Sequence, residues 1–174
     1  LTISMTNVSG PIPSFLGRLT ELGTLDLSSN KFTGPIPDFL SRLTKLTLLN
    51  LSDNRLNGPL SPVLAKLPNL GYLALHTNNL SGPIPDFIAH RLHYLTDLIL
   101  HTNQFSGPVP TSLVQLHNLM FLSLSKNQLS GPVPKSLGGR KLVVLRLGSN
   151  KLTGDAKFLI ETSNNDILEV DIRK

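Results

Sequence analysis

The stretch LDLSSNKFTGPIP, residues 25–37, decides the fold because the chain repeats it, for example as LSLSKNQLSGPVP at residues 122–134. Its glycine recurs at intervals of 24, 24, 24, 25, 24 and 23 residues, at Gly10, Gly34, Gly58, Gly82, Gly107, Gly131 and Gly154. A fixed period of this length is typical of a solenoid, in which each repeat is one structural unit. We therefore expect one array over residues 1–174, with about seven repeats of 23–25 residues and the start of an eighth.

The spacing within the phrase predicts the elements of each repeat. In L-x-L the period is two, so both leucines point inward and each copy adds a short strand to a parallel sheet. The Gly-Pro-Ile-Pro segment, whose prolines lack an N–H, is expected to form a second short strand or a polyproline stretch beside that sheet. Leucines three residues apart then favour 3-10 or short helical turns. The fold class is thus an α/β solenoid, with the parallel sheet on its concave face and the turns on its convex face.

An asparagine occupies the same place in six successive copies. An inward-facing Asn side chain both donates and accepts, so it can satisfy backbone groups where the chain turns. Thr6 holds this place in the first copy, where we expect a less well bonded turn. The sequence thus predicts a structural ladder formed by Asn30, Asn54, Asn78, Asn103, Asn127 and Asn150.

Composition excludes several classes of protein. The chain is 40% hydrophobic and 16% charged, so it has enough aliphatic side chains to fold and is not disordered by composition. It contains no cysteine, which excludes disulfides and thiolate chemistry in this segment, and no apolar run approaches the ~18 residues of a membrane span. The net charge of +5 favours polyanionic surroundings, although basic residues are not interleaved with the aromatic cluster that nucleic-acid binding would need.

The outward strand positions form columns that predict a recognition surface. Four of these residues, Leu48, Tyr72, Ile99 and Phe121, are apolar, which suggests an interface for a protein partner. Paired carboxylates in a protected pocket, a P-loop and zinc signatures are not recognisable, so we expect no enzymatic activity and no cofactor. The candidate partner-binding residues are Asp26, Leu48, Asn50, Asp53, Tyr72, His76, Asp97, Ile99, His101, Phe121, Ser123, Lys126 and Arg146.

Two histidines, His76 and His101, occupy equivalent places one repeat apart, each in a His-Thr-Asn sequence. Their rings should lie about 5 Å apart on neighbouring strands. A metal site that includes Asp97 is one interpretation, but two histidines without a third close ligand are a weak signal. We therefore assign no metal and expect a hydrogen-bonding patch, through which binding would change between about pH 5 and 7.

Several motifs resemble a known family. The phrase Leu-Ser-x-Asn-x-Leu-Ser-Gly-Pro-Ile-Pro is similar to the plant-specific leucine-rich repeat. Within that class, the segment ISMTNVSGPIP at residues 3–13 resembles the early repeats of polygalacturonase-inhibiting proteins, as do the 25-residue copy, the 23-residue copy and LTGDA at residues 152–156. Caps of the kind that repeat arrays need are not visible, so we expect the array to continue at both ends.

This resemblance implies a secreted plant protein of the cell wall, or apoplast, that acts in defence. It would inhibit fungal or insect endopolygalacturonases through its concave face, and its positive charge could hold it on pectin or polygalacturonate. The alternatives are the extracellular domain of a plant leucine-rich repeat receptor-like protein or kinase and, less favoured, an ice-binding protein. N-x-S sequons at Asn7, Asn50 and Asn79 fit secretion and glycosylation.

Overall fold

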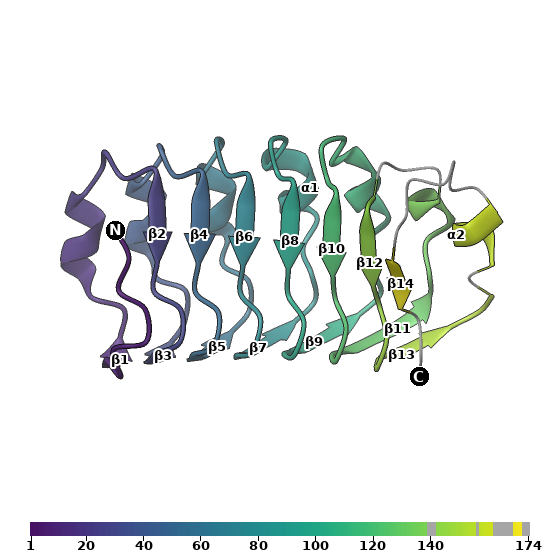
Figure 1. Ribbon diagram of the computed structural model, residues 1–174, viewed down its shortest axis with the longest axis horizontal. Helices are drawn as coiled ribbons and strands as arrows, with labels where there is room; N and C mark the ends of the chain where they lie inside the picture. The colour runs from purple at the N-terminus through teal and green to yellow at the C-terminus, as the bar shows by residue number, and fades with distance from the viewer. Residues whose placement is uncertain (139–141, 156, 162–168, 172–174) are drawn as a thin grey trace.

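The computed structural model describes residues 1–138, 142–155, 157–161 and 169–171, and they form a row of stacked coils (Figure 1). Each coil adds one parallel strand to the sheet nearest the viewer, here called the main sheet. The Cα register aligns Leu25, Leu49, Leu73, Leu98, Leu122 and Leu145, all fully buried, in one interior file. The predicted register is therefore confirmed for strands β2 (Thr24–Asp26), β4 (Leu48–Asn50), β6 (Tyr72–Ala74), β8 (Asp97–Ile99), β10 (Phe121–Ser123), β12 (Val144–Arg146) and β14 (Glu169–Asp171).

A second parallel sheet runs along one edge of the solenoid (Figure 1). It was expected at Gly-Pro-Ile-Pro, but most of its strands end at the glycine, so that prediction was misplaced by about one strand length. The reason is that proline has no N–H to donate to a ladder, whereas the residues before the glycine do. Its strands are β1 (Ser9–Pro11), β3 (Lys31–Gly34), β5 (Arg55–Gly58), β7 (Asn79–Gly82), β9 (Gln104–Gly107), β11 (Gln128–Pro132) and β13 (Lys151–Thr153).

Short helical turns close each coil behind the main sheet, as the leucine spacing predicted. Five are 3-10 turns: η1 (Ser14–Arg18), η2 (Asp38–Arg42), η3 (Pro62–Lys66), η4 (Thr111–Gln115) and η5 (Lys135–Leu137). The 25-residue copy uses its extra residue to form an α-helical turn, α1 (Phe87–Arg91), and α2 (Phe158–Glu161) lies in the last described coil. The shortened copy has only the three-residue η5, and its residues 139–141 lie outside the described part. Within the described ranges, every helix is too short to cross a membrane.

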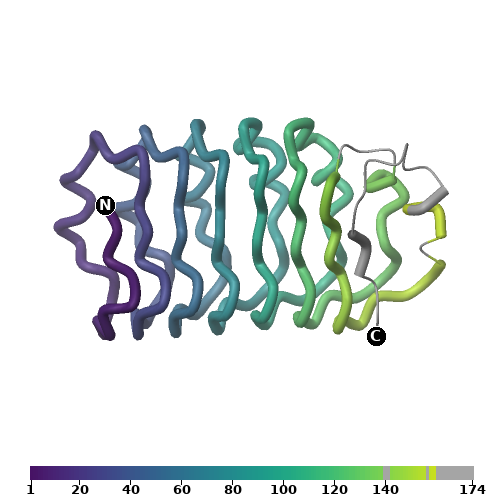
Figure 2. Tube along the Cα trace, in the orientation of Figure 1, coloured from purple at the N-terminus to yellow at the C-terminus, as the bar shows by residue number. Residues whose placement is uncertain are grey.

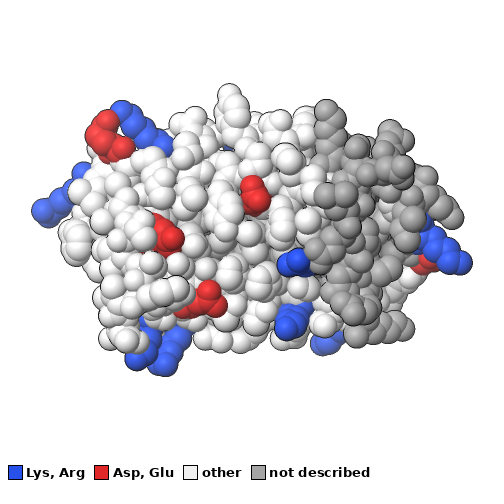
Figure 3. All heavy atoms as spheres, in the orientation of Figure 1, with Lys and Arg blue, Asp and Glu red and all other residues white. Residues whose placement is uncertain are grey.

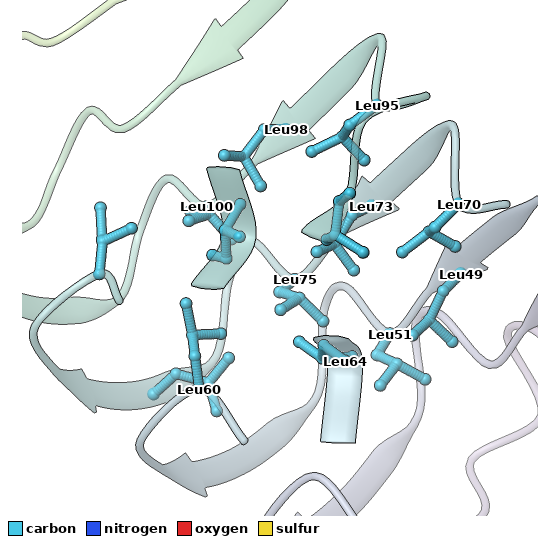
Figure 4. Packing of buried hydrophobic residues seen from close by; sticks show 14 of the residues in the cluster. Leu49, Leu51, Leu60, Leu64, Leu70, Leu73, Leu75, Leu95, Leu98 and Leu100 are labelled. Atoms are coloured by element: carbon cyan, nitrogen blue, oxygen red, sulfur yellow. The ribbon is translucent and has the colours of Figure 1, made fainter. Parts of the chain in front are cut away.

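The coils stack one after another along the solenoid (Figure 2), and leucines from successive coils form a continuous column in its interior (Figure 4). Leu73 and Leu75 of one coil, for example, lie between Leu49 and Leu51 of the preceding coil and Leu98 and Leu100 of the next. Full burial of one such side chain contributes about 1.5–3 kcal/mol. Because each coil packs only on its neighbours, stability is shared along the row.

The asparagine ladder joins each coil to the one before it. The amide of Asn54 donates to the carbonyls of Leu27, Leu51 and Ser52, and its Oδ1 accepts the N–H of Phe32 at 2.9 Å. Asn78, Asn103, Asn127 and Asn150 repeat this pattern one coil further on. Asn30 follows the same pattern, because its amide donates to the carbonyls of Ile3, Leu27 and Ser28 and its Oδ1 accepts the N–H of Val8. Its Oδ1 also accepts the N–H and the hydroxyl of Thr6, the hydroxyl at 2.8 Å. The predicted ladder is confirmed.

Two left-handed positions in each coil shape the turns around this ladder. The repeated glycines have φ between 80° and 87°, a region that a side chain disfavours. The residue before each ladder asparagine is also left-handed, with φ of 53° at Asp53 and Lys126. This second position lies in the turn after each strand of the main sheet, and the side chains of Asp53 and Lys126 are exposed there.

Candidate recognition face

The outward residues of strands β2 to β12, together with the second and third residues after each strand, form one surface, here called the recognition face. One row across the strands contains Leu48, Tyr72, Asp97 and Phe121, which are neighbours in register. The next row contains Asp26, Asn50, Ala74, Ile99, Ser123 and Arg146. The residues that the sequence predicted for binding thus lie on the strands of one sheet or in the turns that follow them, and Figure 3 views that side of the molecule.

The apolar members of this face are partly exposed. Leu48, Tyr72, Ile99 and Phe121 are each half-buried, because neighbouring strands shield their sides while their ends remain accessible. A sheet that presents aromatic and aliphatic groups in this way offers the contacts that protein interfaces use.

Ser123 differs from the expectation. It was predicted to contact a partner, but its exposed fraction is 0% and its Oγ has no hydrogen-bond partner. Its cross-strand neighbours are the larger Ile99 and Arg146, so a short side chain between them is covered. Its side chain is therefore not accessible on the surface described here, and its role in binding stays a prediction.

The histidines form the centre of the face. The rings of His76 and His101 are stacked, with centroids 4.4 Å apart, close to the predicted spacing. Each Nδ1 contacts the hydroxyl of the following threonine, at 3.3 Å for Thr77 and 3.1 Å for Thr102. Parallel stacked rings direct their nitrogens side by side and not toward one point, and no cluster of three metal-ligating side chains occurs in the described part of the chain.

Burial is the main cause of the pKa shifts of these two histidines. It lowers the pKa of His76, which the nearby carboxylate of Asp53 partly opposes. Burial also lowers the pKa of His101, and the neighbouring His76, Arg146 and Lys126 lower it further. Both rings are therefore harder to protonate than a free imidazole.

Tyr72 lies among carboxylates. Burial raises the pKa of its phenol most, and Asp97 and Asp26 raise it further because a phenolate there would be repelled. Asp97 accepts a hydrogen bond from the hydroxyl of Thr96 at 2.6 Å, and Asp26 accepts one from the backbone N–H of Ser28 at 2.9 Å. These bonds hold both carboxylates in place on the face.

Basic groups lie farther along the array. The guanidinium of Arg146 lies over the ring of Phe121, with its Cζ 5.6 Å from the ring centroid. Lys126 is exposed in the turn after β10. The recognition face therefore has carboxylates around Tyr72 and cations near β10 and β12 (Figure 3).

The hydroxyl groups of Thr77, Thr96 and Thr102 were not among the predicted site residues. Each lies next in sequence to a predicted residue, and a threonine beside His or Asp was the signal that could have identified them. Of the sequon asparagines, Asn7 and Asn79 are exposed, whereas Asn50 lies half-buried on the face and accepts from Ser52. Glycosylation at these three positions stays a prediction.

The Leucine Rich Repeat family matches residues 21–43, 45–67 and 118–139. A comparison with curated protein sequences gives no match. The structure, the ladder and this match define a solenoid of stacked repeats, and the chain belongs to the leucine-rich repeat family.

Solved structures with the same fold include plant receptor ectodomains. The ectodomain of the receptor kinase GASSHO1/SCHENGEN3 from Arabidopsis thaliana, in complex with CASPARIAN STRIP INTEGRITY FACTOR 2, is 38% identical, with a TM-score of 0.91. The Arabidopsis receptor kinase HAESA, in complex with the peptide hormone IDA and the co-receptor SERK1, is 32% identical, with a TM-score of 0.87. Each match covers 99% of this chain but only 21% and 29% of the respective receptor chains.

A plant ice-binding protein also has this fold. It is 31% identical with a TM-score of 0.93, and the match covers 99% of this chain and 56% of that protein. The fold alone therefore does not separate a receptor from an ice-binding protein, and the separation depends on the side chains of the recognition face.

Proposed function

We propose that this chain is part of the extracellular ligand-binding domain of a plant leucine-rich repeat receptor-like protein or kinase. Its recognition face would bind a peptide or protein ligand and would carry out no catalysis. The observation that supports this most is the face itself, where half-buried Tyr72, Ile99 and Phe121 lie beside charged groups on one sheet. The similar HAESA structure contains a peptide hormone, which favours a peptide for this chain too.

The size of the face is sufficient for such a ligand. Strands in a sheet are about 4.8 Å apart, so β2 to β12 span roughly 24 Å. A fully extended peptide advances about 3.3–3.6 Å per residue, so roughly seven residues could lie across these strands. The face is therefore long enough to read several ligand side chains.

A binding screen tests this proposal. The full-length protein would be presented with secreted plant peptides, and so would a variant with Tyr72→Ala and Phe121→Ala on the face. The control carries Phe15→Ala and Tyr94→Ala, two exposed aromatic residues outside the face. We expect a ligand that binds the wild type and the control but loses at least tenfold in affinity for the face variant. Equal binding to all three would contradict the proposal.

Inhibition of endopolygalacturonase is the second candidate, and the motifs at residues 3–13 and 152–156 favour it. A standard protein interface covers about 800 Å² of each partner, and the recognition face could supply an area of that size to an enzyme. Assays with a broad panel of fungal and insect enzymes at acidic pH, with and without added polygalacturonate, would decide between the two. If the wild type inhibits one of these enzymes and the Tyr72→Ala variant does not, the inhibitor function would be favoured over the receptor function.

Ice binding is less compatible with this face. A surface that matches ice would be flat and regular, whereas one row here changes from Asp26 through Ala74 and Ile99 to Arg146. Because a plant ice-binding protein has a similar structure, thermal hysteresis is the property that tests this third function. We expect no thermal hysteresis from the full-length protein, and a clear thermal hysteresis would favour this third function.

A further inference from the structure

We propose that the middle of the recognition face accepts a cationic side chain, an arginine or a lysine, from its ligand. The ring of Tyr72 and the carboxylate of Asp97 would be its direct contacts. This inference rests on the proposed function, and it adds the chemistry that a ligand must have at one position.

The two direct contacts are neighbours on one surface. Tyr72 in β6 and Asp97 in β8 are paired in register, so their side chains leave the sheet on the same side, about 5 Å apart at the backbone. The face of an aromatic ring attracts a cation within about 6 Å of its centroid. A ligand cation over Tyr72 would therefore also be within ion-pairing distance of Asp97.

The carboxylate of Asp97 is prepared for such a contact. Its Oδ2 accepts the hydroxyl of Thr96 at 2.6 Å, which fixes the orientation of the group. Among the described hydrogen bonds, its Oδ1 accepts none, and it therefore remains available to a donor from outside. A preoriented carboxylate loses less side-chain freedom when it binds, which favours affinity.

The charges around Tyr72 favour a cation. Asp26 and Asp97 both act on the Tyr72 phenol, and Asp53 acts on the adjacent His76 and His101. In the part of the chain that the structure describes, none of these three carboxylates forms an ion pair, because the ion pairs there join Lys45 to Glu21 and Lys157 to Asp155. Their negative charge is therefore not cancelled locally.

This local sign is opposite to that of the whole chain, whose net charge is +5. Many basic side chains lie at the edges of the view in Figure 3, while carboxylates lie within the face. Lys126 and Arg146 act on His101 from the side of β10 and β12, and they would repel a cation placed there. The field thus directs the ligand cation to Tyr72 and away from Phe121.

Selection from a random peptide library tests the inference. Displayed twelve-residue peptides would be selected on the full-length protein and depleted on the face variant with Tyr72→Ala and Phe121→Ala. We expect the remaining peptides to share an arginine or lysine, and replacement of that residue by glutamine to weaken binding at least tenfold. Asp97→Asn should weaken binding similarly, and the two changes together should cost little more than either alone.

Matched variants separate this contact from a general effect on folding. Tyr72→Phe keeps the ring and should keep the affinity, whereas Tyr72→Leu should lose it. Asp38→Asn removes an exposed carboxylate from η2, outside the face, and should have no effect. Face-dependent peptides without a common cation, or with a cation insensitive to Asp97→Asn, would overturn the inference and leave the proposed function intact. Failure to recover any face-dependent peptide would overturn both.

Discussion

The imidazole rings of His76 and His101 are stacked, with their centroids 4.4 Å apart and their planes 14° from parallel. They occupy the same place in successive coils, so the stack follows from a repeat that places one residue directly beside its equivalent. Two imidazolium charges at this separation would repel each other. The neutral pair is therefore the form that suits the folded protein.

Acidic pH should destabilise the folded protein through the two stacked histidines, His76 and His101. Because burial lowers the pKa of both rings, the folded protein binds these protons less readily than the unfolded chain. The resulting stability is present above the ordinary His pKa of about 6.5 and is lost as the pH falls through the lower folded values. Urea unfolding should therefore show a lower midpoint at pH 5 than at pH 7. A variant with His76→Gln and His101→Gln should lose less stability over that interval.

The matched control for this experiment is His90→Gln with His93→Gln, two exposed histidines at the helical side of the solenoid. It should show the same pH dependence as the wild type. An unchanged acid response in the variant without the stacked pair would contradict the account of His76 and His101.

The second prediction concerns the asparagine ladder. Asn54→Leu removes the amide that donates to three carbonyls and the oxygen that accepts from Phe32. Buried backbone groups without partners cost about 1–3 kcal/mol, and we expect a destabilisation of that size in urea unfolding. Asn57→Leu in the same coil changes an exposed side chain and should have little effect. Similar losses in both variants would argue against the ladder as a structural device.

The third prediction separates backbone conformation from space. An added Cβ would meet no atom within 4 Å at either Gly34 or Gly23, but only Gly34 has a positive φ, of 83°. Gly34→Ala should therefore cost about 1–2 kcal/mol, while Gly23→Ala should be neutral or stabilise by up to about 1 kcal/mol. Thermal or urea unfolding of the pair measures this difference directly. Equal effects would show that φ is not what selects glycine in the repeat.

The fourth prediction concerns the covered hydroxyl on the main sheet. Ser123 is fully buried and its Oγ has no hydrogen-bond partner, so Ser123→Ala removes an unsatisfied polar group without creating a large cavity. We expect unchanged stability or a gain of about 1 kcal/mol. A loss of more than about 1 kcal/mol would show that the hydroxyl has a partner in solution.

Much of this structure could be predicted because equivalent positions of successive repeats occupy the same place in every coil. The period of two in L-x-L placed Leu49 and Leu73 in one file, and the recurring asparagine predicted the ladder that Asn54 forms. The same logic placed Tyr72, His76 and Asp97 on one face. A repeated sequence therefore predicts strand register well, because a wrong assignment of inward and outward positions would conflict with the residue types in every copy.

The features that were missed depend on neighbours and not on the period. Ser123 occupies an outward position but is covered by Ile99 and Arg146, whose size cannot be judged from one strand alone. Strand β3 of the second sheet ends at Gly34 because the following proline has no N–H to donate, and the predicted and observed positions of this strand differ by only a few residues. The left-handed residue before each ladder asparagine, such as Asp53, has no fixed residue type to reveal it.

The central claim is that the outward face of the main sheet holds the ligand, and photo-crosslinking tests it most directly. A benzophenone amino acid would replace Tyr72 or Phe121 on the face, and Phe15 or Tyr94 outside it, in the presence of the ligand found by the binding screen. Phe15 is 58% and Tyr94 65% exposed, so both are more accessible than the half-buried face residues. We predict crosslinks from the first two positions only; crosslinks from Phe15 or Tyr94 without any from Tyr72 and Phe121 would contradict it.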